Sequence, residues 1–109
     1  MTVPKILVHV TNGPEHPTRA ALAFLVARTA IEQGHAVSLF LAGDAVQLLR
    51  EATLDGVTGL GTGRLREHYD AIVKGGGKFY LSGMSSGARG IGGAGLAGKA
   101  AGLAPPPVV

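Results

Sequence analysis

Three short segments of the chain carry the side chains that could bind a ligand or take part in a reaction. Each directly follows an apolar run: Thr11-Asn12-Gly13, Ala42-Gly43-Asp44, and the residues from Ser82 to Ser86, with Arg89 one helical turn further on. Together they offer a carboxylate, an amide, hydroxyls, a guanidinium and backbone N–H groups, which suit an anion or small polar ligand better than an apolar one. The candidate ligand-binding residues are Asn12, Gly13, Gly43, Asp44, Ser82, Gly83, Ser85, Ser86 and Arg89.

An ordinary structural role explains some of the same residues. Asp44, Ser85 and Ser86 stand where helices are expected to begin. Asp and Ser are preferred at helix N-caps, because their side-chain oxygens accept hydrogen bonds from the first backbone N–H groups. Arg89 would then be a solvated residue at a helix end. The sequence leaves both interpretations open.

Ser82 raises the question of a serine nucleophile at the end of a strand. A nucleophile elbow reads Gly-x-Ser-x-Gly, whereas the residues here are Tyr80-Leu81-Ser82-Gly83-Met84. His16 and His68 are candidate bases only if the fold or a partner subunit brings them close to Ser82. The sequence therefore supports serine chemistry weakly, assigns no catalytic residue, and leaves open whether the protein is an enzyme.

The composition excludes several classes of function. The 109 residues contain no cysteine, which excludes disulfides, thiolate metal ligands and a cysteine nucleophile. The histidines show no i,i+3 or i,i+4 pairing, and the glycine-rich segment at residues 59–63 lacks the Gly-Lys-Ser/Thr ending of a phosphate-binding loop, so we expect no metal and no cofactor. The net charge of +3 comes from scattered basic residues, without the clusters that nucleic-acid binding needs.

A cytoplasmic location is expected from the apolar segments. No charged and apolar leader precedes the first strand-like run. The longest apolar stretch, residues 20–27, is far shorter than the roughly 18 residues that a membrane span requires. We therefore expect no membrane partner.

Alternating strand and helix patterns predict an α/β domain. Residues 6–10 and 36–41 are continuous apolar runs, typical of strands that are buried on both faces of a parallel sheet. Between them, Pro17 suits the first turn of a helix over residues 18–33, which ends at Gly34. Strand, helix and strand in this order form a right-handed parallel unit.

The second half of the chain continues the alternation. We expect a helix from Asp44 to about Ala52, a loop over residues 53–63, a helix over 65–73, a strand over 78–81 and a short helix up to Gly90. The predicted fold is a three-layer α/β/α sandwich with a mostly parallel sheet of about four to five strands. Because ligands bind at the carboxyl ends of such strands, the three polar segments should lie together. The domain is expected over residues 1–91, followed by a Gly/Ala/Pro-rich tail over 92–109.

Stretches of residues 5–91 resemble the DsrE/DsrF-like family, which includes TusD-like subunits. The similar stretches are residues 5–11, 38–44 and 79–90, and the last of these is the most specific. The resemblance implies a three-layer α/β sandwich that assembles as trimers or hexamers. The best-known members relay sulfur as a persulfide on a cysteine at a strand end, followed by six residues and then Arg-Gly. Counting back from Arg89-Gly90 puts Ser82 at that position. The family usually adds a helix and a last strand where this chain has its tail.

Serine cannot hold a persulfide, because its hydroxyl lacks the thiolate character that sulfur exchange requires. We therefore expect a protein related to sulfur relay without its own persulfide cysteine, an oligomeric accessory or small-ligand-binding subunit. Its expected partners are further copies of itself, supported by the nearly all-round apolar segment at residues 20–31, and sulfur-relay proteins. The alternatives are an enzyme with non-thiol chemistry that uses Asp44, Ser82 and Arg89, or a purely structural subunit.

Overall fold

A computed structural model describes residues 5–82 and 102–104 of the chain. In chain order the elements are β1 (Lys5–Val10), α1 (Pro17–Glu32), β2 (Ala36–Leu41), the 3-10 helix η1 (Gly43–Leu49), α2 (Glu51–Gly56), β3 (Thr58–Gly59), β4 (Gly63–Arg64), α3 (Leu65–Lys74), β5 (Lys78–Ser82) and β6 (Gly102–Ala104). The α/β class predicted from the alternating pattern is confirmed.

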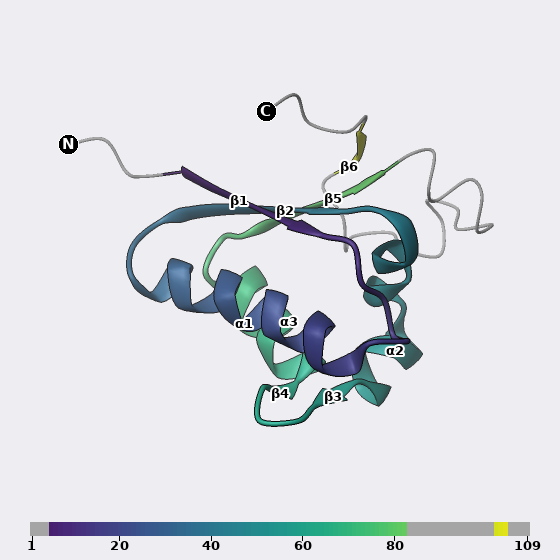
Figure 1. Cartoon of the computed structure of the whole chain (residues 1–109). Helices are drawn as coiled ribbons and strands as arrows, with labels where there is room; N and C mark the ends of the chain where they lie inside the picture. Colours follow the sequence, from purple (N-terminus) through teal and green to yellow (C-terminus); the bar gives the residue numbers. More distant parts are fainter. Residues whose placement is uncertain (1–4, 83–101, 105–109) are drawn as a thin grey trace.

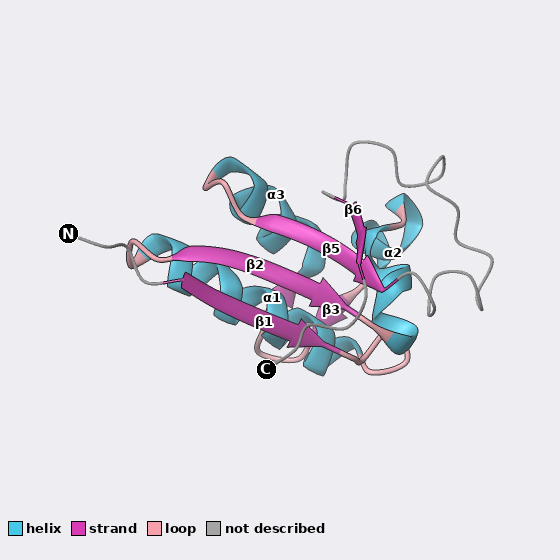
Figure 2. Ribbon diagram, turned by 90° about the horizontal axis from the view of Figure 1, so that it is seen from above, coloured by secondary structure: helices cyan, strands magenta, loops and turns pink. Residues whose placement is uncertain are grey.

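The central feature is a four-stranded parallel sheet with the spatial order β1-β2-β5-β6. Its register aligns Val10 with Leu41 and Leu41 with Leu81, so that β1, β2 and β5 end at the same edge (Figure 2). β3 and β4 form a separate antiparallel pair. The mostly parallel sheet expected from the apolar runs is therefore present.

The described helices all lie on one face of this sheet, with α1 and α3 side by side beneath the strands (Figure 1). Strand residues alternate between the two faces, and those in the core face the helices. The strand residues between them point to the opposite side of the sheet, which we call the second face. They are Lys5, Leu7 and His9 of β1, Ala36, Ser38 and Phe40 of β2, and Lys78, Tyr80 and Ser82 of β5.

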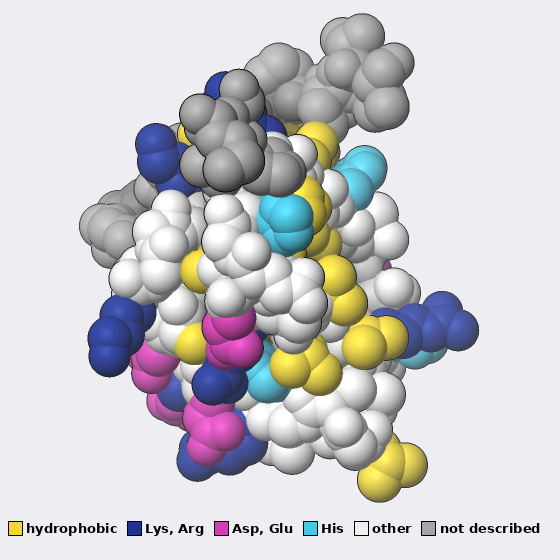
Figure 3. All heavy atoms as spheres, turned by 90° about the vertical axis from the view of Figure 1, so that its left-hand side faces the viewer, with side chains coloured by type: hydrophobic (Ala, Val, Ile, Leu, Met, Phe, Trp, Pro, Cys, Tyr) yellow, Lys and Arg dark blue, Asp and Glu magenta, His cyan; other side chains and the backbone are white. Residues whose placement is uncertain are grey.

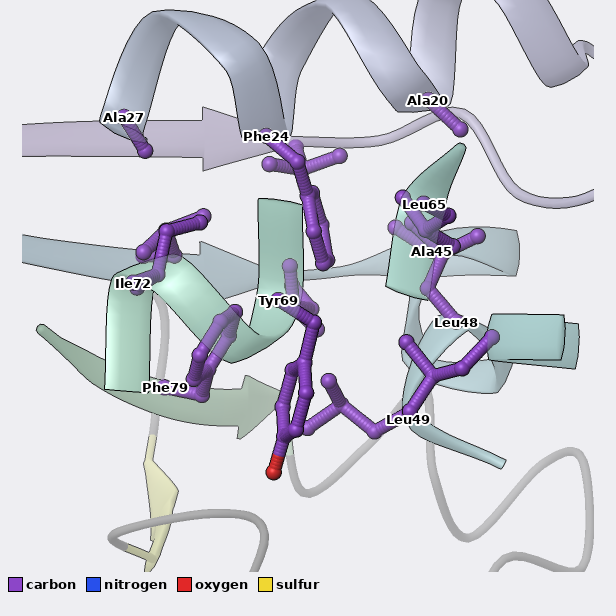
Figure 4. Packing of buried hydrophobic residues seen from close by; sticks show 14 of the residues in the cluster. Ala20, Phe24, Ala27, Ala45, Leu48, Leu49, Leu65, Tyr69, Ile72 and Phe79 are labelled. Atoms are coloured by element: carbon purple, nitrogen blue, oxygen red, sulfur yellow. The ribbon is translucent and has the colours of Figure 1, made fainter. Parts of the chain in front are cut away.

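Aromatic rings join the helical layer to the sheet. Phe24 of α1 and Tyr69 of α3 both meet Phe79 of β5, with ring centroids 5.5 and 5.2 Å from that of Phe79 (Figure 4). Ala20 and Ala27 are fully buried on α1 and let this helix approach the strands closely. Tilted ring pairs of this kind add to the stabilisation that burial alone provides.

The segment after β2 differs from the single helix predicted to run from Asp44 to about Ala52. It forms the 3-10 helix η1 and then α2, separated by Arg50 in extended backbone conformation. Residues three apart lie on one side of a 3-10 helix, which places Ala45 above Leu48 and Val46 above Leu49. All four are buried, so the tighter helix keeps its apolar side against the core.

The predicted loop over residues 53–63 contains the end of α2 and the hairpin formed by β3 and β4. The hairpin lies against α1, because the Leu60 N–H donates a hydrogen bond of 3.1 Å to Thr18 Oγ1. Gly61 and Gly63 have φ angles of +75° and +85°, a conformation that glycine adopts without strain. The glycines therefore form a tight turn rather than an open connection.

The predicted C-terminal tail contains β6, which pairs in parallel with β5 at the edge of the sheet. Gly102, Leu103 and Ala104 show no strand pattern in the sequence, since three residues are too few to display alternation. The expectation that a tail replaces the family's last strand is therefore wrong at these three residues. The predicted short helix up to Gly90 and the rest of the tail lie outside the described residues.

Within the described part of the chain, no helix combines the length and the apolar character needed to cross a membrane. The longest is α1, with 16 residues.

Replacing Phe24 by alanine should destabilise the fold strongly, because the ring is fully buried against Phe79. Phe→Ala changes in protein cores cost about 3–5 kcal/mol. Urea unfolding followed by circular dichroism should therefore show a much lower midpoint for Phe24→Ala. Leu60→Ala is the control, because Leu60 is 90% exposed and its truncation should leave the midpoint unchanged. Equal midpoints for the two variants would contradict the packing described.

Candidate functional site

The carboxyl ends of β1 and β2 bring two of the predicted polar segments into contact. The Ala42 N–H donates a hydrogen bond of 3.0 Å to the Val10 carbonyl, so the segments after β1 and β2 leave the sheet side by side (Figure 2). Asn12 is half-buried in the first segment, and Asp44 is exposed in the second. Two of the three predicted segments therefore form one surface at the strand ends.

Gly13 is the point at which these segments touch. A Cβ atom at this position would collide with the backbone carbonyl of Asp44 and lie 2.7 Å from Glu15 Oε2. The Gly13 N–H donates to Glu15 Oε1 at 2.8 Å, and the Gly13 carbonyl accepts from the His16 N–H at 3.1 Å. The loop therefore turns tightly into α1, and a glycine is needed for the close approach of the backbones.

Gly43 turns the chain out of β2. Its φ angle of +59° lies in the left-handed region that glycine adopts readily. A Cβ atom at this position would lie 3.6 Å from the Thr11 carbonyl oxygen. Asp44 then lies in the first turn of η1, where Ala42 and not Asp44 occupies the N-cap. The N-cap role considered for Asp44 is therefore wrong, although a carboxylate in the first turn still interacts favourably with the helix dipole.

Ser82 ends β5 at the same edge of the sheet, one position beyond the aligned pair of Leu41 and Leu81. It is only 3% exposed, and its register partner on the other side is Ala104 of β6. Because Leu81 faces the helices, Ser82 belongs to the second face. The remaining predicted site residues, Gly83, Ser85, Ser86 and Arg89, lie outside the described part of the chain.

The two histidines considered as bases have different positions. His16 is the N-cap residue of α1, at the strand-end side of the molecule. His68 of α3 is buried in the helical layer, with Nε2 at 2.6 Å from the Thr62 carbonyl oxygen and Nδ1 at 3.4 Å from Arg28 Nη1. His68 therefore connects the hairpin, α3 and α1, and does not serve as a base at the strand ends.

An ion-pair cluster that the sequence analysis missed fastens α2 to α3. Arg66 Nε lies 2.9 Å from Asp55 Oδ1, and the guanidinium also pairs with Glu51. Hydrogen bonds to Asp55 and Glu51 raise the pKa of Arg66, and burial raises the pKa of the Tyr69 phenol on the same helix. Glu51 and Asp55 stand four residues apart on one side of α2, and this spacing was the available signal. The cluster holds in place the segment that follows η1.

Comparison with known proteins supports the resemblance noted in the sequence. The sequence profile of the DsrE/DsrF-like family matches residues 4–103. The match extends beyond the strand that ends at Ser82 and reaches into β6. A search of curated proteins gives no match to this chain.

Gly13→Ala should disturb the strand-end surface, because the added methyl group would press on the Asp44 backbone. Overpacking of this kind costs about 1–3 kcal/mol, which denaturant unfolding can measure. Gly56→Ala is the matched control, since no atom lies within 4 Å of a Cβ at that position. It should be neutral or stabilising by up to about 1 kcal/mol. A similar loss of unfolding free energy in both variants would argue against the close approach of the two loops.

Proposed function

The chain belongs to the DsrE/DsrF-like family, and from this premise we propose that it acts as an accessory subunit in sulfur relay without carrying sulfur covalently. The observation that carries the proposal is the residue at the end of β5. The resemblance puts the persulfide cysteine of the best-known members at this strand end, and here the residue is Ser82. The 109 residues contain no cysteine that could replace it.

The chemistry of persulfide transfer supports a role without covalently bound sulfur. A thiolate attacks the outer sulfur of a donor, forms a new S–S bond and releases the shortened donor as an anion. The hydroxyl of Ser82 remains protonated near neutral pH and does not form such a bond. The chain is therefore limited to noncovalent roles in a relay, such as holding a ligand or contacting a partner protein.

We propose that the strand-end surface holds a small anionic or polar ligand. The close approach of Gly13 to the Asp44 backbone supports this proposal, because it joins the loops after β1 and β2 into one surface. Ser82 ends the next strand along the same edge. The enzymatic alternative receives less support, since Ser82 is buried and His68 is engaged elsewhere. The proposed ligand set also includes Gly83, Ser85, Ser86 and Arg89 from the sequence analysis.

A second part of the proposal is assembly with further copies of the chain. Leu22 and Val26 on the outer side of α1 are 47% and 51% exposed. They border an apolar groove of about 360 Å³, and hydrophobic side chains gather along one side of the face shown in Figure 3. The groove is lined by Ile6, Leu22, Leu25, Val26, Thr29, Ala30, Gln33 and His35. An apolar groove along a helix favours a protein interface, and the family resemblance implies a trimer or hexamer.

Light scattering should therefore give the mass of a trimer or a multiple of it at micromolar concentration. Val26→Glu should lower this mass to that of the monomer, because a charge would be buried in the interface. Leu60→Glu is the control, since this residue is exposed on the hairpin and does not line the groove. A wild-type monomer would contradict the assembly, and dissociation by Leu60→Glu alone would move the interface to the hairpin.

Introducing a thiol at the strand end tests the proposed role of position 82. Inorganic polysulfide is a small donor that suits a position only 3% exposed. We expect Ser82→Cys to gain about 32 Da per transferred sulfur atom, and to lose it again on treatment with a reductant. The wild type should show no covalent gain, because it has no thiol.

Ala30→Cys provides the matched control, because Ala30 is similarly buried, at 8% exposed, and lies near the end of α1, away from the strand ends. It should accept less sulfur than Ser82→Cys at the same donor concentration and reaction time. A thiol at position 82 that stays unmodified, or that reacts no better than the one at position 30, would refute the assignment.

A further inference from the structure

A groove crosses the second face of the sheet near the amino ends of the strands, at the opposite end from Gly13, Gly43 and Ser82. Its volume is about 500 Å³, which is within the range of sites for small molecules. The lining residues come from the first halves of β1, β2 and β5 and the turn before β5: Lys5, Ile6, Leu7, Ala36, Val37, Ser38, Gly76, Lys78 and Tyr80.

The register of the sheet directs two lysines toward this groove. Ser38 pairs with both Leu7 and Lys78, and Lys5 lies two residues before Leu7, so both lysines belong to the second face. With strands about 4.8 Å apart and a rise of about 3.3 Å per residue, the two lysine Cα atoms lie about 12 Å apart. The flexible four-carbon stems of the lysines allow both ammonium groups to reach one bound group.

The charges and hydrogen-bond donors of the groove select an anion. The described residues of its lining include two lysines and no carboxylate, and the half-buried Ser38 and Tyr80 add two hydroxyls. Among the described residues, the ion pairs are formed by Arg28 and Arg66, and neither Lys5 nor Lys78 takes part. An oxyanion between the two lysines would receive charge-assisted hydrogen bonds, which are stronger than those between neutral groups.

We propose that this groove is a binding site for an oxyanion of the phosphate or sulfate type, separate from the strand-end surface. The oxyanion contacts Lys5 and Lys78, and the hydroxyls of Ser38 and Tyr80 donate to its remaining oxygens. Leu7 is 48% exposed on the second face and also lines the groove, so the groove has room for an apolar group attached to the anion. The ligand is thus either an inorganic oxyanion or a small organic molecule that carries one.

Titration of the full chain with inorganic phosphate, inorganic sulfate and phenyl phosphate tests this site. Amide chemical shifts at low chloride concentration should change mainly at Lys5, Ser38 and Lys78. Lys5→Gln and Lys78→Gln should each weaken binding about tenfold, and added salt should weaken wild-type binding. Tighter binding of phenyl phosphate would identify an organic ligand, and equal binding an inorganic one.

Lys74→Gln is the matched control, because this exposed lysine at the end of α3 does not line the groove. It should leave the affinity unchanged. No saturable binding of the three probes, or an equal loss in Lys74→Gln, would overturn the proposal. Shift changes at residues 12–13 and 43–44 instead would also overturn it, and would place the anion at the strand-end surface proposed above. The two proposals can therefore fail separately.

Discussion

The parallel alignment of β1, β2 and β5 is the constraint on which the other features of the molecule depend. Because Val10, Leu41 and Leu81 stand in register, the chain leaves all three strands at one edge of the sheet. The same alignment separates the residues that meet the helices from those of the second face, which include Lys5, Ser38 and Lys78. The strand-end surface and the lysine-lined groove thus lie at opposite ends of one sheet, formed by the same strands.

Elements whose burial produces a regular sequence pattern were predictable. The apolar runs at residues 6–10 and 36–41 identified β1 and β2, and Pro17 marked the start of α1. On that helix the Arg28 and Glu32 side chains, four residues apart, form an ion pair at 3.0 Å. The helix predicted over residues 65–73 corresponds to α3. It was predictable because its polar and apolar sides differ clearly.

Features that depend on contacts between distant segments were not predictable. The spacing of Ala45, Val46, Leu48 and Leu49 fits an α-helix as well as the tighter helix η1, and β6 is recognisable only by its pairing with β5. At the site, the sequence selected the strand ends from the parallel order alone. It did not reveal that Gly13 packs on the Asp44 backbone, or that Ser82 is buried. These properties arise from the packing of whole loops.

Because the residue at the end of β5 is a serine, we propose that this family member takes part in sulfur relay only through noncovalent contacts. Native mass spectrometry of the protein as purified, followed by denaturation of the same sample, tests this claim most directly. We expect an assembly of three subunits or a multiple of three, and after denaturation the mass of the 109-residue chain without added sulfur. A monomer, or a denatured chain with covalently attached sulfur, would contradict it.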